Sequence, residues 1–265
     1  MIPKSSRVTL PRKRPALAPL DPPPELSIVI PVHNEEACLV PLMDKLWATL
    51  ESMGETFEVI MVDDGSNDAS GTLLGMAMSH RPQLRVLKLD HNCGQSAAMD
   101  CGFRHARGDV IVTLDADLQN DPSDIPTVYN MVRSGACDVA CGWRKSRQDS
   151  WVRRLSSRIA NRVRNTLSGE SIRDTGCSLK AYRSLHLQRI KMYQGMHRFL
   201  PTLLKMEGAR VAEVPVRHHP RLAGTSKYGL RNRAWRSLVD LMAICWMKNR
   251  HLNYQATEAR LEACS

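Results

Sequence analysis

Short apolar runs recur along this chain, and most are followed by a longer segment of helical character. The clearest runs are residues 27–30 (Ser-Ile-Val-Ile) and 110–112 (Val-Ile-Val). Strands that are apolar at nearly every position are typical of parallel sheets, because helices cover both faces of such sheets. Alternation of these strands with helices predicts an α/β fold, in which an open, doubly wound, Rossmann-like sheet is mostly parallel and has helices on both faces.

Strands are expected over six segments of this apolar kind: 26–32, 57–64, 84–90, 109–115, 138–142 and 209–216. A helix is expected to begin at Asp121-Pro122, because Asp is a good N-cap and Pro suits the first helical turn. The other helices are expected over 35–52, 69–80, 95–106, 151–168 and 183–207, and a last one over about 229–249.

The length of 265 residues suits one sizeable domain with appendages. Residues 1–25 are basic and rich in proline, and are expected to be disordered. We expect one folded domain over 26–228, and a C-terminal amphipathic helix and tail over 229–265. The sequence contains no run of about 18 apolar residues, so no transmembrane helix is expected. A signal peptide is not expected either, because prolines interrupt the N-terminus where it would need an apolar core. The protein is therefore expected on the cytoplasmic side.

An excess of basic residues predicts an anionic partner. The chain has 37 Lys and Arg against 27 Asp and Glu, a net charge of +10. This balance suits nucleic acid, a phospholipid surface or a phosphorylated small molecule. Nucleic acid is disfavoured, because only 5% of the residues are aromatic and neither zinc-finger spacing nor an RNP-like motif is present.

The basic residues gather in two segments, 144–164 and 217–236. The first has eight Lys and Arg with one acid, and the second has six with no acid. Arginine offers planar, bidentate donors that suit phosphate oxygens. Arg154, Arg158 and Arg162 recur every four residues, so one helix face would present them together. We expect this face, with Arg144, to receive an acceptor phosphate; a merely solvated basic face is the alternative.

Carboxylates cluster where three of the predicted strands end. The segments are 31–36 (Pro-Val-His-Asn-Glu-Glu), 62–66 (Val-Asp-Asp-Gly-Ser) and 114–119 (Leu-Asp-Ala-Asp-Leu-Gln). Ligands of open α/β sheets bind beyond the carboxyl ends of the strands. Like charges crowd there only at a cost, so the clustering predicts a divalent metal, or a hydrogen-bonded nucleobase and ribose.

Asp115, Asp117 and Gln119 are each two residues apart, so on an extended chain their side chains point to the same side. They offer hard oxygen ligands, which Mg²⁺ and Mn²⁺ prefer together with substrate phosphates. The pattern therefore predicts a Mg²⁺ or Mn²⁺ site, with a solvated acidic turn as the alternative for the Asp-x-Asp motif taken alone.

Four segments of the chain resemble the family 2 glycosyltransferases of GT-A fold. They are the strand-end segments 31–36 and 62–66, residues 92–95 (Asn-Cys-Gly-Gln) and residues 115–120 (Asp-Ala-Asp-Leu-Gln-Asn). Three later segments resemble the polyprenyl-phosphate branch, which includes dolichyl-phosphate mannosyltransferase and bacterial undecaprenyl-phosphate sugar transferases. These segments are 174–182 (Asp-Thr-Gly-Cys-Ser-Leu-Lys-Ala-Tyr), 213–216 and 221–228. The resemblance covers about residues 26–250.

The resemblance implies a role for each matching side chain. Pro31, His33 and Glu35 would border the nucleotide base and ribose, although the family usually has Tyr where His33 stands. Asp64 would hydrogen-bond the base, Asp115 would lie near the ribose and the metal, Asp117 would bind the metal and Gln119 would complete its shell. Arg221 and Lys227 would clamp the donor diphosphate, and His197 and Arg198 would add a further basic contact.

A mechanism follows from the acceptor implied by the resemblance. A lipid phosphate is already an anion near neutral pH, so it needs cationic positioning rather than a strong general base. Asp117, Arg158 and Asp174 are the expected catalytic residues, with Asp174 orienting the acceptor or a sugar hydroxyl. The alternative for Asp174 is a turn-forming residue before Thr175-Gly176.

The expected activity is metal-dependent, inverting transfer from a UDP- or GDP-sugar to a polyprenyl phosphate, for cell-envelope glycan or glycolipid synthesis. The enzyme would be peripheral on the cytoplasmic face of the membrane. Two alternatives stay open: transfer to a saccharide hydroxyl, and an inactive partner in a membrane glycan complex. The C-terminal helix either lies on an anionic membrane or packs on the domain or in a homo-oligomer interface.

Overall fold

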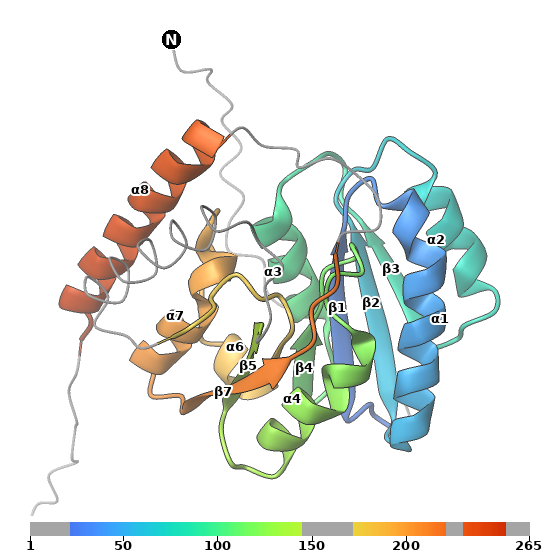
Figure 1. Cartoon of the computed structure of the whole chain (residues 1–265), viewed down its shortest axis with the longest axis horizontal. Coiled ribbons are helices and arrows are strands. Elements are labelled where there is room, and N and C mark those ends of the chain that lie inside the picture. Colours follow the sequence, from blue (N-terminus) through green and yellow to red (C-terminus); the bar gives the residue numbers. More distant parts are fainter. Residues whose placement is uncertain (1–21, 145–171, 221–229, 253–265) are drawn as a thin grey trace, which may run out of the picture.

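A seven-stranded sheet with helices on both faces forms the centre of the computed structural model, which describes residues 22–144, 172–220 and 230–252 (Figure 1). The strands are β1 (Leu26–Val32), β2 (Phe57–Asp63), β3 (Leu84–Lys88), β4 (Val110–Thr113), β5 (Val139–Arg144), β6 (Lys180–Arg183) and β7 (Val211–Val216). Their order across the sheet is β3-β2-β1-β4-β6-β5-β7. All six predicted strands are confirmed, with ends that shift by a few residues.

β6 is the strand that the sequence did not predict. It runs antiparallel to both of its neighbours, β4 and β5, whereas the other pairings in the sheet are parallel. β6 has only four residues, and Lys180 and Arg183 at its ends hide the apolar signal of Ala181 and Tyr182, which are fully buried. Because β6 is reversed, Lys180 lies at the sheet edge where β4 ends.

The helices largely follow the predicted segments. They are α1 (Glu36–Met53), α2 (Ser70–Met78), α3 (Gln95–His105), α4 (Ile125–Arg133), α6 (Ser184–Leu187), α7 (Leu200–Met206) and α8 (Leu230–Asn249), with 3₁₀ turns η1 (Pro122–Asp124) and η2 (Met196–Phe199). Asp121 caps η1, as expected, because its side chain accepts a hydrogen bond from the Ser123 N–H. Residues 1–21 of the tail predicted over 1–25, and the helix predicted over 151–168, lie outside the described residues.

The single helix predicted over 183–207 is wrong. The segment forms α6, then irregular backbone up to Gly195, and then η2, which α7 follows directly. Gly195 interrupts it with φ at 84°, in the left-handed region that side chains rarely adopt. Any side chain at this position would also collide with the carboxylate of Asp240 on α8. The break therefore lets α8 approach the domain closely.

Alternate residues of β1 pack on opposite faces of the sheet. Ile28 and Ile30 contact a core that includes Leu42 and Leu46 of α1, whereas Val29 belongs to a second core. That second core contains Met99 and Phe103 of α3, and Leu200 and Leu204 of α7. The sheet is thus covered on both faces, as its continuous apolar strands predicted.

One face of α8 packs on the domain. Leu241 and Ile244 are buried against Met196, Phe199 and Leu203 in a third, smaller core. Val239, Met242 and Trp246 are exposed on the same helix. The predicted amphipathic character is not established, because the side chains of 230–238 are outside the described part of the chain. Within that described part, none of the helices combines the length and the apolarity that a bilayer crossing requires.

Candidate active site

The acidic segments meet at one edge of the sheet. β1 pairs in parallel with β2 and β4, so Val32 lies beside Asp63, and Val29 beside Thr113 two residues before Asp115. β6 begins at the same edge, with Lys180 beside Thr113. The topology therefore brings together segments 31–36, 63–66, 114–120 and 174–180, as the strand-end pattern predicted for the first three.

Asp64 is buried and anchors the loop that precedes α3. Its Oδ1 accepts a hydrogen bond from the Cys93 N–H at 2.7 Å, and its Oδ2 accepts one from the Gly94 N–H at 2.9 Å. The two N–H groups stand at the N-terminus of α3, so these hydrogen bonds fix the Asp64 side chain beside the start of that helix. A carboxylate has about four lone-pair sites, so Asp64 retains acceptor capacity for a base.

His33 links the end of β1 to the two neighbouring loops. Its Nδ1 lies 2.9 Å from the Asp64 carbonyl oxygen, and its Nε2 lies 2.9 Å from Asn92 Nδ2. A carbonyl only accepts and an amide nitrogen only donates, so Nδ1 carries the proton and Nε2 accepts. The two contacts therefore fix the orientation of the ring at the position predicted to border the nucleotide base.

The Asp-x-Asp motif forms a compact acidic turn. Asp115 Oδ1 accepts a hydrogen bond from Gln95 Nε2 at 2.9 Å, and Asp117 Oδ1 accepts one from the Gln119 N–H at 3.2 Å. Leu118 has a positive φ of 58°, which folds the turn back on itself. Burial and the neighbouring Asp117 carboxylate raise the pKa of Asp115 to about 6. Two carboxylates that disfavour each other's charge, beside an amide, are a donor set that fits Mg²⁺ or Mn²⁺.

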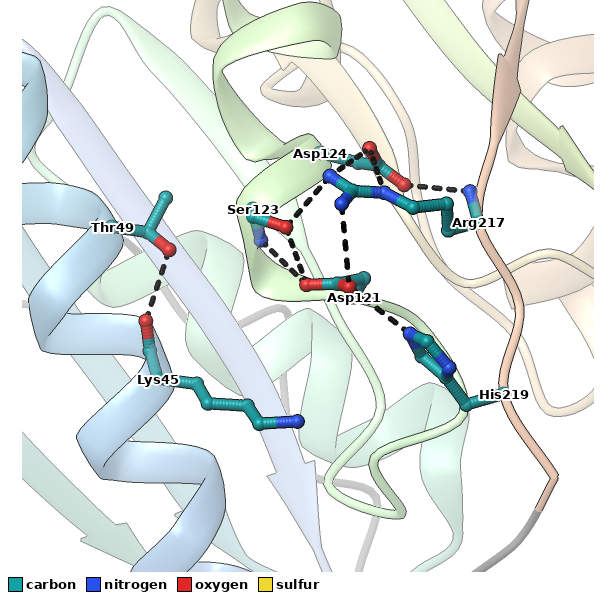
Figure 2. Close-up of polar contacts among 7 residues, drawn as sticks. All are labelled: Lys45, Thr49, Asp121, Ser123, Asp124, Arg217 and His219. Carbon is teal, nitrogen blue, oxygen red and sulfur yellow. Dashed lines mark hydrogen bonds and ion pairs between the residues drawn. The ribbon is translucent and has the colours of Figure 1, made fainter.

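The chain that follows β7 is held against this turn and against residues 121–124, which follow the turn; Figure 2 shows the contacts of Arg217 and His219 with residues 121–124. The His219 N–H donates to the Gln119 carbonyl at 2.8 Å, and Asn120 pairs with His218 in an isolated β-bridge. Arg217 donates through Nε and Nη2 to Asp124 Oδ1 at 3.0 and 2.8 Å. These contacts fix residues 217–220 beside the acidic turn; Arg221 and Lys227 lie outside the described residues.

Arg144 and Asp174, which the sequence assigned to different roles, form an ion pair. Arg144 Nε and Nη2 donate to Asp174 Oδ2 and Oδ1 at 2.6 and 2.9 Å. The Gly176 N–H also donates to Asp174 Oδ1, at 3.2 Å. The Arg144 guanidinium is thus oriented by a buried carboxylate at the end of β5. Arg154, Arg158 and Arg162 lie outside the described residues.

A pocket of about 120 Å³ opens between the sheet edge, α3 and η2. Three of the predicted donor-site residues, Pro31, Asp115 and His197, contribute to its wall, together with Arg198. His197 is positioned by Ser96, whose Oγ lies 2.7 Å from His197 Nδ1. The pocket also contains residues that the sequence reading missed, namely Gln95, Ser178 and Lys180. The available signal for Lys180 was a lysine between the apolar residues Leu179 and Ala181.

Residues 27–190 match the family model described as glycosyl transferase family 2. The chain belongs to glycosyltransferase family 2. The match covers the acidic turn, the Asp64 and His33 contacts and the Arg144–Asp174 pair. The resemblance read from the strand-end motifs is therefore confirmed at the level of the family.

Curated relatives of this family 2 chain are named as polyprenyl-phosphate sugar transferases. It is 39% identical over 224 residues to dodecaprenyl-phosphate galacturonate synthase of Rhizobium johnstonii, with 83% of this chain and 66% of the relative covered. It is 42% identical over 219 residues to undecaprenyl-phosphate 4-deoxy-4-formamido-L-arabinose transferase of Edwardsiella ictaluri, with 82% and 65% covered. The chain thus spans about two thirds of the length of these relatives.

Solved structures confirm the predicted GT-A type of fold. Glucosyl-3-phosphoglycerate synthase from Mycobacterium tuberculosis, in a complex with Mn²⁺, UDP and glucosyl-3-phosphoglycerate, has a TM-score of 0.65 at 16% identity. The similarity covers 84% of this chain and 80% of that one. A second structure of the same synthase holds Mg²⁺ and UDP, with a TM-score of 0.66.

Asp121→Ala in this family 2 protein is expected to lower the free energy of unfolding by about 2 kcal/mol at pH 7, because the change removes an N-cap and the contact to His219. Partial burial opposes ionisation of Asp121, but hydrogen bonds from Ser123 and His219 and the charge of Arg217 outweigh it and hold its pKa at about 2. A lowered pKa stabilises the fold above the unfolded value of about 4 and ceases to do so as pH falls through 2.

Thermal unfolding of the wild type and Asp121→Ala should therefore show a Tm difference that is constant from pH 5 to 8 and shrinks below about pH 4. Asp44→Ala, which removes an exposed carboxylate paired with Arg81 on the protein surface, is the matched control and should change Tm little. A Tm difference for Asp121→Ala that grows on acidification would contradict this account of the contact.

Proposed function

We propose that this chain transfers a sugar from a UDP- or GDP-linked donor to a polyprenyl phosphate, with inversion and with help from Mg²⁺ or Mn²⁺. The observation that carries the proposal is the convergence at one sheet edge of Asp64, the acidic turn 115–119 and the fixed segment 217–220. The names of the curated relatives, which are polyprenyl-phosphate sugar transferases, support the acceptor class.

The donor nucleotide would lie over the ends of β1 and β2. His33 presents a ring of fixed orientation there, and Asp64 retains acceptor sites for the N–H groups of a base. Pro31 and Glu35 border the same edge. In this arrangement the hydrogen bonds to Cys93, Gly94 and Asn92 keep the recognition groups in place before the donor arrives.

Asp115, Asp117 and Gln119 would hold the cation, which supplies positive charge to the leaving diphosphate when it is bound. Hydrogen bonds from the Gln95 amide and the Gln119 N–H hold an oxygen of Asp115 and of Asp117 in position. Arg221 and Lys227 follow the fixed segment 217–220 in sequence and would clamp the donor diphosphate. Their donors would stabilise negative charge that develops as the glycosidic bond to the phosphate breaks.

The acceptor phosphate would be positioned by arginines rather than activated by a base. Asp174 fixes the Arg144 guanidinium by a bidentate pair, so Arg144 contributes charge in a defined orientation. Arg154, Arg158 and Arg162 would supply the remaining contacts. A phosphate oxygen would attack the anomeric carbon from the face opposite the leaving diphosphate, so the new bond would have inverted configuration.

We further propose that the protein works as a peripheral enzyme on the cytoplasmic face of the membrane, where its lipid substrate would lie. The exposed Val239, Met242 and Trp246 of α8 are the described side chains best suited to contact a bilayer, because Trp and long apolar side chains favour the interface.

A donor panel tests the proposal. Purified protein would receive undecaprenyl phosphate, Mg²⁺ or Mn²⁺, and a series of UDP- and GDP-sugars, with lipid extracts followed by mass spectrometry. We expect one or a few donors to give a lipid-linked sugar, with loss of product in chelator and recovery on adding metal. Transfer that persists without divalent metal would remove the acidic turn from its proposed role.

A further inference from the structure

Lys180 is a buried cation that no step above uses. Only 4% of the residue is exposed, and its side chain lies on the wall of the pocket between the sheet edge, α3 and η2. Its Nζ donates one hydrogen bond, to the Thr175 carbonyl at 3.2 Å. Among the described residues, it makes neither a second hydrogen bond through Nζ nor an ion pair with a carboxylate.

A buried ammonium group with one carbonyl partner is incompletely compensated. An ammonium has three donors, so two of them are left for a ligand in the pocket. Burial of a charge is costly unless a counter-charge and hydrogen bonds offset the lost hydration. Asp115 lies on the same wall and accepts a hydrogen bond from the Gln95 amide; the Lys180 charge opposes the rise in the pKa of Asp115, but no ion pair joins the two side chains within the described residues.

The sheet holds Lys180 rigidly in this position. Its backbone pairs with Thr113 of β4 and Cys141 of β5. Thr113 Oγ1 also donates to the Ser178 carbonyl at 2.6 Å, which ties the preceding loop to β4. A rigid lysine in a pocket wall is a pre-organised donor rather than a mobile surface charge.

The pocket has the size and charge for a small anionic group. Arg198 and His197 line it with Lys180, against the single carboxylate of Asp115. Its volume of about 120 Å³ leaves room for a carboxylate or phosphate group.

We propose that Lys180, with Arg198 and His197, forms an anion subsite that binds an anionic oxygen group of a substrate. This inference rests on the proposed function and deepens it. The group is either a carboxylate on the donor sugar or the phosphate of the lipid acceptor, since both offer the same oxygen chemistry. Lys180 thereby selects or places a charged substrate group next to the acidic turn.

Lys180→Met tests the proposal, with Lys180→Arg as the charge-retaining variant and Lys205→Met, an exposed lysine on α7, as the matched control. We expect Lys180→Met to raise one KM about tenfold or more, with a much smaller change in kcat. If the KM rises for donors with a sugar carboxylate but not for neutral hexose donors, the subsite binds the donor. A rise in the KM for undecaprenyl phosphate with every donor assigns it to the acceptor.

A stability measurement separates this role from a structural one. In ligand-free protein we expect Lys180→Met to raise Tm, because it removes an incompletely compensated buried charge. Inorganic phosphate should raise the Tm of the wild type and of Lys205→Met more than that of Lys180→Met at equal ionic strength. This readout does not require transfer activity, so failure of the proposed function would not hide it. Equal phosphate effects in all three proteins, or a fall in Tm for Lys180→Met with unchanged KM values, would overturn the subsite.

Discussion

Asp117→Asn is expected to lower kcat/KM for sugar transfer by about 10³-fold, with little change in Tm. Asn has the same shape, and its side-chain oxygen can still accept the hydrogen bond from the Gln119 N–H. What the variant loses is a full negative charge at the centre of the proposed metal site. The same change should lower the pKa of Asp115, because the Asp117 carboxylate is one cause of its raised value.

Steady-state kinetics at saturating Mn²⁺, together with Mn²⁺ titration followed by electron paramagnetic resonance, measure the two effects separately. The variant should bind Mn²⁺ weakly, and its kcat/KM should stay low even at high metal concentration. Asp44→Asn, which removes an exposed carboxylate on α1, should match the wild type in both measurements. Activity of Asp117→Asn within about threefold of the wild type would show that the acidic turn is not the metal site.

Asp174→Ala is expected to have the largest effect on stability, a loss of about 3–5 kcal/mol. The Arg144 side chain is 18% exposed, so removing Asp174 takes the bidentate carboxylate away from a largely buried guanidinium. The Gly176 N–H also loses its acceptor. For a chain of this size the loss corresponds to a fall in Tm on the order of 10 °C.

A double-mutant cycle tests whether the pair is the cause. Arg144→Met alone should also destabilise the protein, because it removes the guanidinium that pairs with the buried Asp174 carboxylate. The Arg144→Met, Asp174→Ala double variant should lose less stability than the sum of the two single changes. Strict additivity, or a loss below about 1 kcal/mol for Asp174→Ala, would mean that water compensates both groups.

Much of the fold could be predicted from hydrophobic patterning. The parallel strands are apolar at nearly every position because helices cover both faces, and that local pattern is visible without tertiary contacts. β6 could not be found in this way, since a four-residue antiparallel strand with a charged residue at each end has no periodicity of its own. The break at Gly195 depends on the close approach of α8, which is a tertiary property.

The candidate site, like the fold, could be predicted where it depends on local sequence and not where it depends on tertiary contacts. The acidic turn and Asp64 follow strand ends, and a strand end can be read from sequence. The Arg144–Asp174 pair joins residues 30 positions apart, and the Arg217–Asp124 contact joins residues 93 apart. No local spacing encodes such pairs, so Arg144 and Asp174 were assigned independent roles. The arginine row at 154–162 stays a prediction.

A direct comparison of acceptors tests the central claim most sharply. With the best donor and metal, the protein would be offered undecaprenyl phosphate, undecaprenol and a saccharide acceptor in parallel, and each product would be identified by mass spectrometry and ³¹P nuclear magnetic resonance. The account predicts a sugar phosphodiester of inverted configuration from undecaprenyl phosphate, and no product from undecaprenol or the saccharide. Transfer to a saccharide hydroxyl, with none to the lipid phosphate, would contradict it.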